Sequence, residues 1–169
     1  MRSLVTLVMI LGLGACTKEQ PGSEGPPAAG GPRACTEIGC INGLRVTMDK
    51  ATAWAAGGYT FEIGVEGTKI TCKGALPLKA CDAGPSLQCD PADRVTIGES
   101  GCALPPESHG FSDIQFGGGE PPREVELKIM KDGEALHTAR LSPTYKTVQP
   151  NGAGCPPVCN NASETVQIP

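Results

Sequence analysis

Nine cysteines constrain this 169-residue chain more than any other feature. Eight of them lie between residues 35 and 159, whereas the first, Cys16, stands apart near the amino terminus. An odd number of cysteines in an exported chain leaves one without a disulfide partner, so we expect one of the nine to have a different fate. Its isolated position identifies Cys16 as that residue.

The first fifteen residues have the organisation of an export signal. Arg2 supplies a positive charge, residues 4–13 form an apolar stretch, and the small residues Gly14 and Ala15 precede Cys16. A membrane-spanning helix needs about 20 apolar residues, and this stretch is only half that length. We therefore do not expect a retained transmembrane anchor.

The sequence Leu13-Gly14-Ala15-Cys16 resembles the lipobox of bacterial lipoproteins, in which the cysteine is lipidated and becomes the first residue of the mature protein. The resemblance implies that residues 1–15 are a signal peptide and that acyl chains such as palmitate on Cys16 hold the protein in membrane lipid. Thr17 stands where an Asp resembles an inner-membrane retention signal in some bacteria, which favours the outer membrane. The alternative is an ordinary signal peptide whose cleavage leaves Cys16 as a free thiol.

The residues that follow Cys16 have the composition of a tether. Residues 17–34 are rich in Gly and Pro and contain no large apolar side chain, so they cannot bury enough surface to offset the entropy lost on ordering. We expect residues 16–34 to be the lipid anchor and a disordered linker. Residues 35–169 are then long enough for one domain with a single core.

Turn residues and alternating apolar residues predict an all-β domain. The 23 Gly and 16 Pro of the chain are largely distributed between short runs of β-branched and aromatic residues, which is typical of a β-sandwich, Ig-like or similar. In residues 59–72 the alternation predicts a hairpin that turns at Glu66-Gly67 and sets Phe61 opposite Cys72. Cys72 would then point into the core.

A second hairpin is predicted over residues 124–140, around Asp132-Gly133. We expect a three-residue loop, which sets Val125 opposite Ala139 and places His137 beside Leu127. Further strands are expected at residues 44–48, 94–97, 112–116, 145–148 and 165–168, giving about nine in total, with at most a helical turn or two over residues 49–56.

The eight cysteines after the linker are an even set in a chain predicted to enter an oxidising compartment, and we expect disulfides. Sequence alone leaves all 105 connectivities open. A metal or redox module is the alternative, because Cys35 and Cys40 are close in sequence, as are Cys155 and Cys159, although neither spacing suits zinc or a dithiol well. The disulfide candidates are Cys35, Cys40, Cys72, Cys81, Cys89, Cys102, Cys155 and Cys159.

Catalysis has few candidate residues. There are two histidines, and His109 lies in a polar segment with Glu107, Ser108 and Asp113, which could combine a nucleophile, a base and an orienting carboxylate in an envelope hydrolase. The same composition is that of an ordinary turn. We expect no enzyme activity, no cofactor and no metal site.

The charge of the chain and its C-terminal sequence indicate which kinds of partner to expect. The chain carries 14 basic and 18 acidic side chains without a basic cluster, so no nucleic-acid partner is expected. Residues 150–159, "PNGAGCPPVC", resemble the C-terminal end of cysteine-containing proteobacterial lipoproteins of unknown activity. The sequence therefore predicts a lipid-anchored cell-envelope protein whose β-sandwich has a binding or structural role, with an envelope protein as the possible partner.

Overall fold

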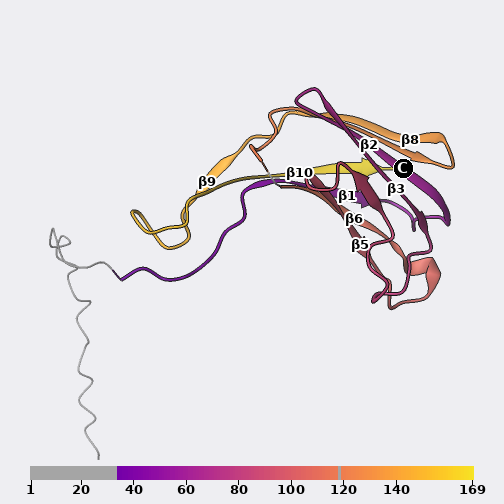
Figure 1. The fold of residues 1–169 in the computed structure, drawn as a ribbon, viewed down its shortest axis with the longest axis horizontal. Coiled ribbons are helices and arrows are strands. Elements are labelled where there is room, and N and C mark those ends of the chain that lie inside the picture. The colour runs from indigo at the N-terminus through magenta and orange to yellow at the C-terminus, as the bar shows by residue number, and fades with distance from the viewer. Residues whose placement is uncertain (1–33, 118) are drawn as a thin grey trace, which may run out of the picture. The chain divides into compact units, whose positions relative to one another are not determined.

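The computed structural model describes residues 34–117 and 119–169, and within it Cys35–Pro169 forms one compact unit. This unit is a β-sandwich of two five-stranded sheets (Figure 1), which confirms the predicted fold class. The first sheet has the order β5-β6-β1-β10-β9 and the second has the order β4-β3-β2-β7-β8. The strands are β1 (Gly43–Lys50), β2 (Gly57–Val65), β3 (Thr68–Leu76), β4 (Gln88–Asp90), β5 (Val95–Ser100), β6 (Gly110–Phe116), β7 (Val125–Lys131), β8 (Glu134–Leu141), β9 (Lys146–Val148) and β10 (Cys159–Ile168).

The first and last strands of the unit lie side by side. β1 and β10 pair in parallel from Gly43 opposite Asn161 to Lys50 opposite Ile168, whereas every other pairing between the described strands is antiparallel. β10 is longer than the predicted strand at residues 165–168 because its polar first half also pairs with β1. β4, which the sequence did not predict, is a three-residue edge strand beside β3.

The first hairpin has the predicted register. Phe61 lies opposite Cys72, and the Cys72 side chain is fully buried. Glu66 and Gly67 form the two-residue turn with φ values of 48° and 78°. Positive φ at both positions is the mark of a type I′ turn, whose twist matches that of the strands.

The second hairpin differs from the prediction. Asp132 and Gly133 form a two-residue turn with φ values of 51° and 87°, and the extra residue is Leu136 of β8, which forms a β-bulge opposite the step from Ile129 to Met130. Val125 is therefore opposite Leu141 and not Ala139, and His137 is opposite Ile129 and not beside Leu127. The expected three-residue loop was wrong because the extra residue is inserted into strand β8 and not into the turn.

The connection between β1 and β2 contains no helix, contrary to the helical turn allowed for residues 49–56. Trp54 in this connection packs edge-on against Tyr59 and Phe111, with ring centroids 5.5 and 5.1 Å away, and Phe111 contacts Phe61 in the same way. Packing of Trp54 into this aromatic cluster overrides the helix propensity of the surrounding alanines. The described region contains a single 3-10 turn, η1 (Pro106–Ser108). No helix within residues 34–117 and 119–169 is long and apolar enough to span a membrane.

Candidate functional site

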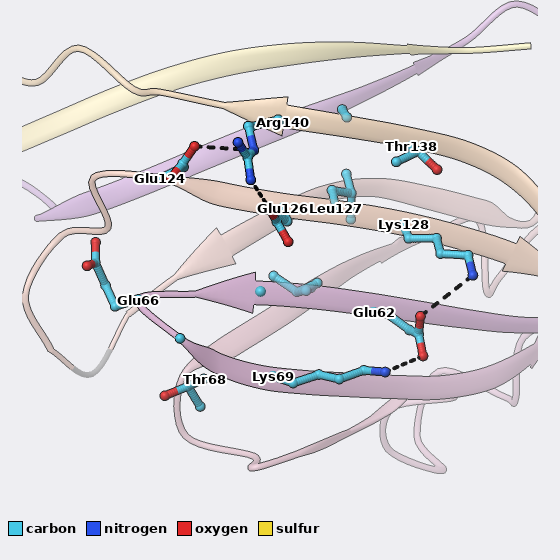
Figure 2. A pocket seen from close by; sticks show the side chains of 14 residues that line it. Glu62, Glu66, Thr68, Lys69, Glu124, Glu126, Leu127, Lys128, Thr138 and Arg140 are labelled. Atoms are coloured by element: carbon cyan, nitrogen blue, oxygen red, sulfur yellow. Dashed lines mark hydrogen bonds and ion pairs between the residues drawn. The ribbon is translucent and has the colours of Figure 1, made fainter.

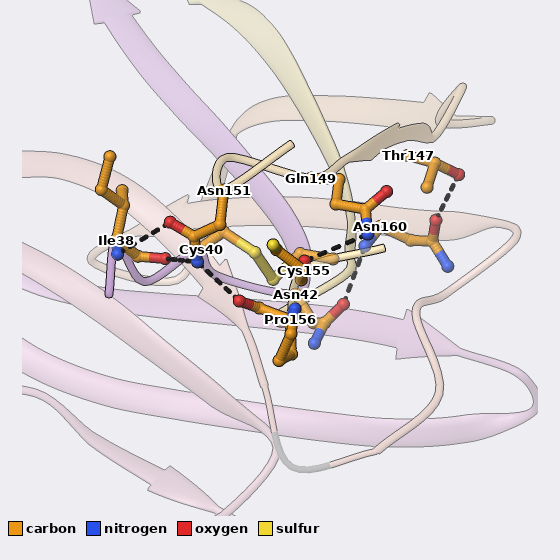
Figure 3. The surroundings of a disulfide bond; sticks show 10 residues. Ile38, Cys40, Asn42, Thr147, Gln149, Asn151, Cys155, Pro156 and Asn160 are labelled. Carbon is orange, nitrogen blue, oxygen red and sulfur yellow. Dashed lines mark hydrogen bonds between the residues drawn. A yellow bond between two sulfur atoms is a disulfide. The ribbon is translucent and has the colours of Figure 1, made fainter. Parts of the chain in front are cut away.

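All eight predicted cysteines form disulfides. The bonds join Cys35 to Cys155, Cys40 to Cys159, Cys72 to Cys89 and Cys81 to Cys102. The two closely spaced pairs considered for a metal or dithiol site do meet, but each cysteine of one pair is bonded to a cysteine of the other. Figure 3 shows the surroundings of one of these bonds. Within residues 34–117 and 119–169 there is no group of three or more metal-ligating side chains. Cys16 lies outside the described residues.

His109 holds the main chain of two connections. Its side chain is buried, its Nδ1 accepts a hydrogen bond from the Leu78 amide at 2.9 Å, and its Nε2 donates to the Leu104 carbonyl at 2.9 Å. This arrangement assigns the proton to Nε2, since an amide must donate to Nδ1. Neither nitrogen is directed at a nucleophile.

The three residues that the sequence analysis considered together with His109 do not surround its side chain. Glu107 and Ser108 are exposed in η1, and the Asp113 carboxylate is paired with Arg45 at 2.9 Å. The other histidine, His137, is half-buried in β8, and no described residue is hydrogen-bonded to its buried Nε2. The triad considered for a hydrolase is therefore absent from the described arrangement.

A groove of about 820 Å³ lies on the outer face of the second sheet (Figure 2). Outward-facing residues of β2, β3, β7 and β8 line it, because alternate residues of neighbouring strands share a face. Gly64 lies in the middle row, opposite Lys69 on one side and Glu126 on the other. A Cβ atom at this position would lie 3.4 Å from the Cβ of Glu126, so the glycine leaves this part of the groove open.

Charged side chains in ion pairs surround the open part of the groove at Gly64. Glu62 is 2.6 Å from the Lys69 ammonium and 3.9 Å from that of Lys128. The hydrogen bond from Lys69 lowers the pKa of Glu62 below its usual value, and the nearby lysine charges act in the same direction. Arg140 is paired with Glu124 at 3.2 Å and also with Glu126.

This arrangement suits recognition by charge. Exposed ion pairs contribute about 0–1 kcal/mol each, so charged groups of a ligand can replace their partners at little expense in stability. Hydroxyl groups of Thr68 and Thr138 add hydrogen-bonding capacity at the rim, and neither histidine nor cysteine lines the groove. The groove can therefore hold an extended segment that carries both positive and negative groups.

Sequence reasoning missed this groove. The alternation of Glu and Lys at outward positions of both hairpins was visible, and it is the signal that could have indicated a charged sheet face. The alternation did not reveal that β2 of the first hairpin is the neighbour of β7 of the second, which brings Glu62 opposite Lys128.

The comparisons with other proteins add no family to this description. No protein-family model matches the chain, and neither a curated protein nor a solved structure was found to be similar to it.

Proposed function

We propose that this chain is a bacterial lipoprotein that acts by binding, without catalysis, in the cell envelope. Acylation of Cys16 would hold it in membrane lipid, with the outer membrane favoured, and the β-sandwich would bind an envelope protein. The leader sequence and the residues around Cys16 support the anchor. The four disulfides support residence in an oxidising compartment, where such bonds form and persist.

The groove around Gly64 is the observation that carries the binding role. It is formed by regular strands with weakly paired charges, and rigid strands hold recognition groups at fixed spacing. The ligand that fits is an extended polypeptide segment of mixed charge, whose acidic groups would meet Lys69 and Lys128 and whose basic groups would meet Glu124 and Glu126.

Affinity capture from native envelope fractions tests this role, with the full chain as bait. Gly64→Leu would fill the groove, whereas Thr47→Leu changes an exposed position of β1 on the other sheet and serves as the matched control. We expect a recurrent protein to be captured by the parent and by the control but not by Gly64→Leu. Equal recovery with all three baits would contradict a binding role for the groove.

The anchor has its own test. Mass spectrometry of the mature protein from its native host should find residues 1–15 removed and Cys16 acylated, and Cys16→Ser should release the chain from the membrane fraction. An intact leader, or an unmodified Cys16 in the mature protein, would rule the anchor out.

A further inference from the structure

A second surface feature lies where the chain enters the domain. We define the disulfide tip as residues 35–42 and 149–160, which the bridges Cys35–Cys155 and Cys40–Cys159 join. Large apolar side chains are strongly exposed at four described positions, and three of them belong to this tip: Ile38 (55%), Ile41 (79%) and Val158 (55%). The fourth, Leu104, lies in the connection between β5 and β6.

The second bridge brings the exposed residues of the two segments together. Cys40 and Cys159 have their Cα atoms 6.1 Å apart, and Ile41 and Val158 are their immediate neighbours in sequence. Because successive Cα atoms are 3.8 Å apart, the Cα atoms of Ile41 and Val158 lie within about 14 Å of each other. Ile38 precedes Cys40 by two residues and lies in the same cross-linked region.

Hydrogen bonds fix the shape of the tip (Figure 3). The Asn151 side chain accepts from the Ile38 amide and donates to the Ile38 carbonyl, each at 3.0 Å, and it also donates to the Pro156 carbonyl. Asn42 accepts from the Asn160 amide at 2.8 Å. The exposed apolar side chains therefore extend from a framework held by both disulfides and hydrogen bonds, and little ordering is needed for them to contact a surface.

The charge of the tip indicates the kind of surface. Its two segments contain a single charged side chain, Glu37, in contrast to the densely charged groove of the second sheet. Exposed aliphatic groups with almost no charge match the boundary between lipid headgroups and acyl chains, where apolar side chains are buried without desolvating ions.

The chain before the tip indicates the same surface. Cys16 precedes Cys35 by a segment that spans about 65 Å at most when fully extended, so an acylated Cys16 confines the domain close to the bilayer. The segment joins the domain at the tip. Confinement raises the effective concentration of the tip at the membrane, so even a weak contact becomes occupied.

We propose that the disulfide tip docks on the bilayer and inserts Ile38, Ile41 and Val158 into its interface. This inference rests on the proposed lipid anchor. Docking would fix the orientation of the domain, which a tether alone would leave free, and it would give the groove a defined direction relative to the membrane.

Tryptophan quenching in vesicles tests the docking. The full acylated chain is reconstituted in vesicles of phosphatidylcholine brominated along its acyl chains, as Ile41→Trp and, for the matched control, as Leu104→Trp. Both variants retain Trp54, so its emission is a shared background. We expect quenching that places the indole introduced at position 41 about 5–10 Å inside the headgroup boundary, and no added quenching for Leu104→Trp.

The outcomes separate this inference from the anchor. Vesicle flotation with equal quenching of the two variants would overturn docking and leave the anchor intact. Failure of the parent chain to float would overturn both. Flotation with the position-41 indole unquenched and with chains cross-linked to one another through the tip would assign the apolar side chains to self-association, against the proposal.

Discussion

At the scale of single residues, the two histidines have opposite surroundings. His109 is buried and satisfies one main-chain donor and one main-chain acceptor, whereas His137 is half-buried and its Nε2 lacks a partner in the described part of the chain. A buried donor or acceptor that loses its partner costs about 1–3 kcal/mol. His109 therefore stabilises the fold by joining the connection that carries Leu78 to the one that carries Leu104.

Substitution of each histidine by alanine tests this difference. We expect His109→Ala to lower the free energy of unfolding by about 2–4 kcal/mol, because the Leu78 amide and the Leu104 carbonyl both lose a partner. His137→Ala is the matched control and should lower it by less than about 1 kcal/mol. Urea unfolding followed by far-ultraviolet circular dichroism measures both changes. Equal losses of unfolding free energy in the two variants would mean that the hydrogen bonds of His109 do not contribute to stability.

At the scale of elements, the turns and strands of the second sheet are joined by exposed carboxylates. Asp132 in the β7–β8 turn forms an ion pair with Lys131 at 2.6 Å and accepts from the Gly58 amide of β2 at 2.7 Å. The hydrogen bond from Lys131 and the one from Gly58 both lower the pKa of Asp132 below its usual value. Glu62 of β2 has its pKa lowered in the same way, first by Lys69.

These lowered pKa values predict a loss of stability in acid. A carboxylate whose pKa is lower in the folded than in the unfolded chain stabilises the fold above the unfolded pKa, near 4, and this contribution is lost as pH falls through the folded pKa. Asp132→Asn should therefore be less stable than the parent at neutral pH and should show a flatter decline between about pH 5 and pH 2. Unfolding midpoints in urea across this range measure the decline.

Asp93→Asn is the control for removal of one exposed carboxylate. Asp93 lies in the turn between β4 and β5, and within the described residues it forms no hydrogen bond or ion pair. If Asp132→Asn and Asp93→Asn changed the pH dependence of stability equally, the change in net charge would explain the effect. The contacts of Asp132 would then not be its cause.

Local patterns predicted elements better than they predicted neighbours. The alternation around Phe61 gave the first hairpin with its register, since a two-residue turn fixes every later pair. The second hairpin had equally clear alternation, but a bulge at Leu136 of β8 shifted its pairs, and no residue type marks a bulge reliably. The disulfide pairing, the β2–β7 contact and the burial of His109 depend on residues far apart in sequence, so local patterns did not predict them. The groove in turn requires the β2–β7 contact, which brings the charged residues of the two hairpins together.

At the scale of the whole molecule, two bridges close nearly the same loop. Cys35–Cys155 and Cys40–Cys159 span 120 and 119 residues, and they lie beside the parallel pair of β1 and β10. A bridge stabilises mainly by restricting the unfolded chain, and the effect grows with the loop that it closes. When one of these bridges is present, the other closes a loop of only about ten residues, so each largely replaces the other.

The two bridges should therefore be strongly non-additive. With one bridge intact, Cys35→Ser/Cys155→Ser or Cys40→Ser/Cys159→Ser should each lower the free energy of unfolding by about 2.5 kcal/mol. Removal of both pairs should lower it by about 7 kcal/mol, since the last bridge restricts a loop of more than a hundred residues, and a domain of ordinary stability would then be largely unfolded. Urea unfolding of the parent and the three variants under non-reducing conditions measures the free energies of unfolding, which together form a double-mutant cycle. Cys72→Ser/Cys89→Ser is the control. It opens a loop with a sequence separation of 17 that lies inside the two long loops and changes their length little, so its effect should add to that of either single-bridge variant. If the losses from the two long-range bridges simply added, restriction of the unfolded chain could not be the way in which they hold the first and last strands together.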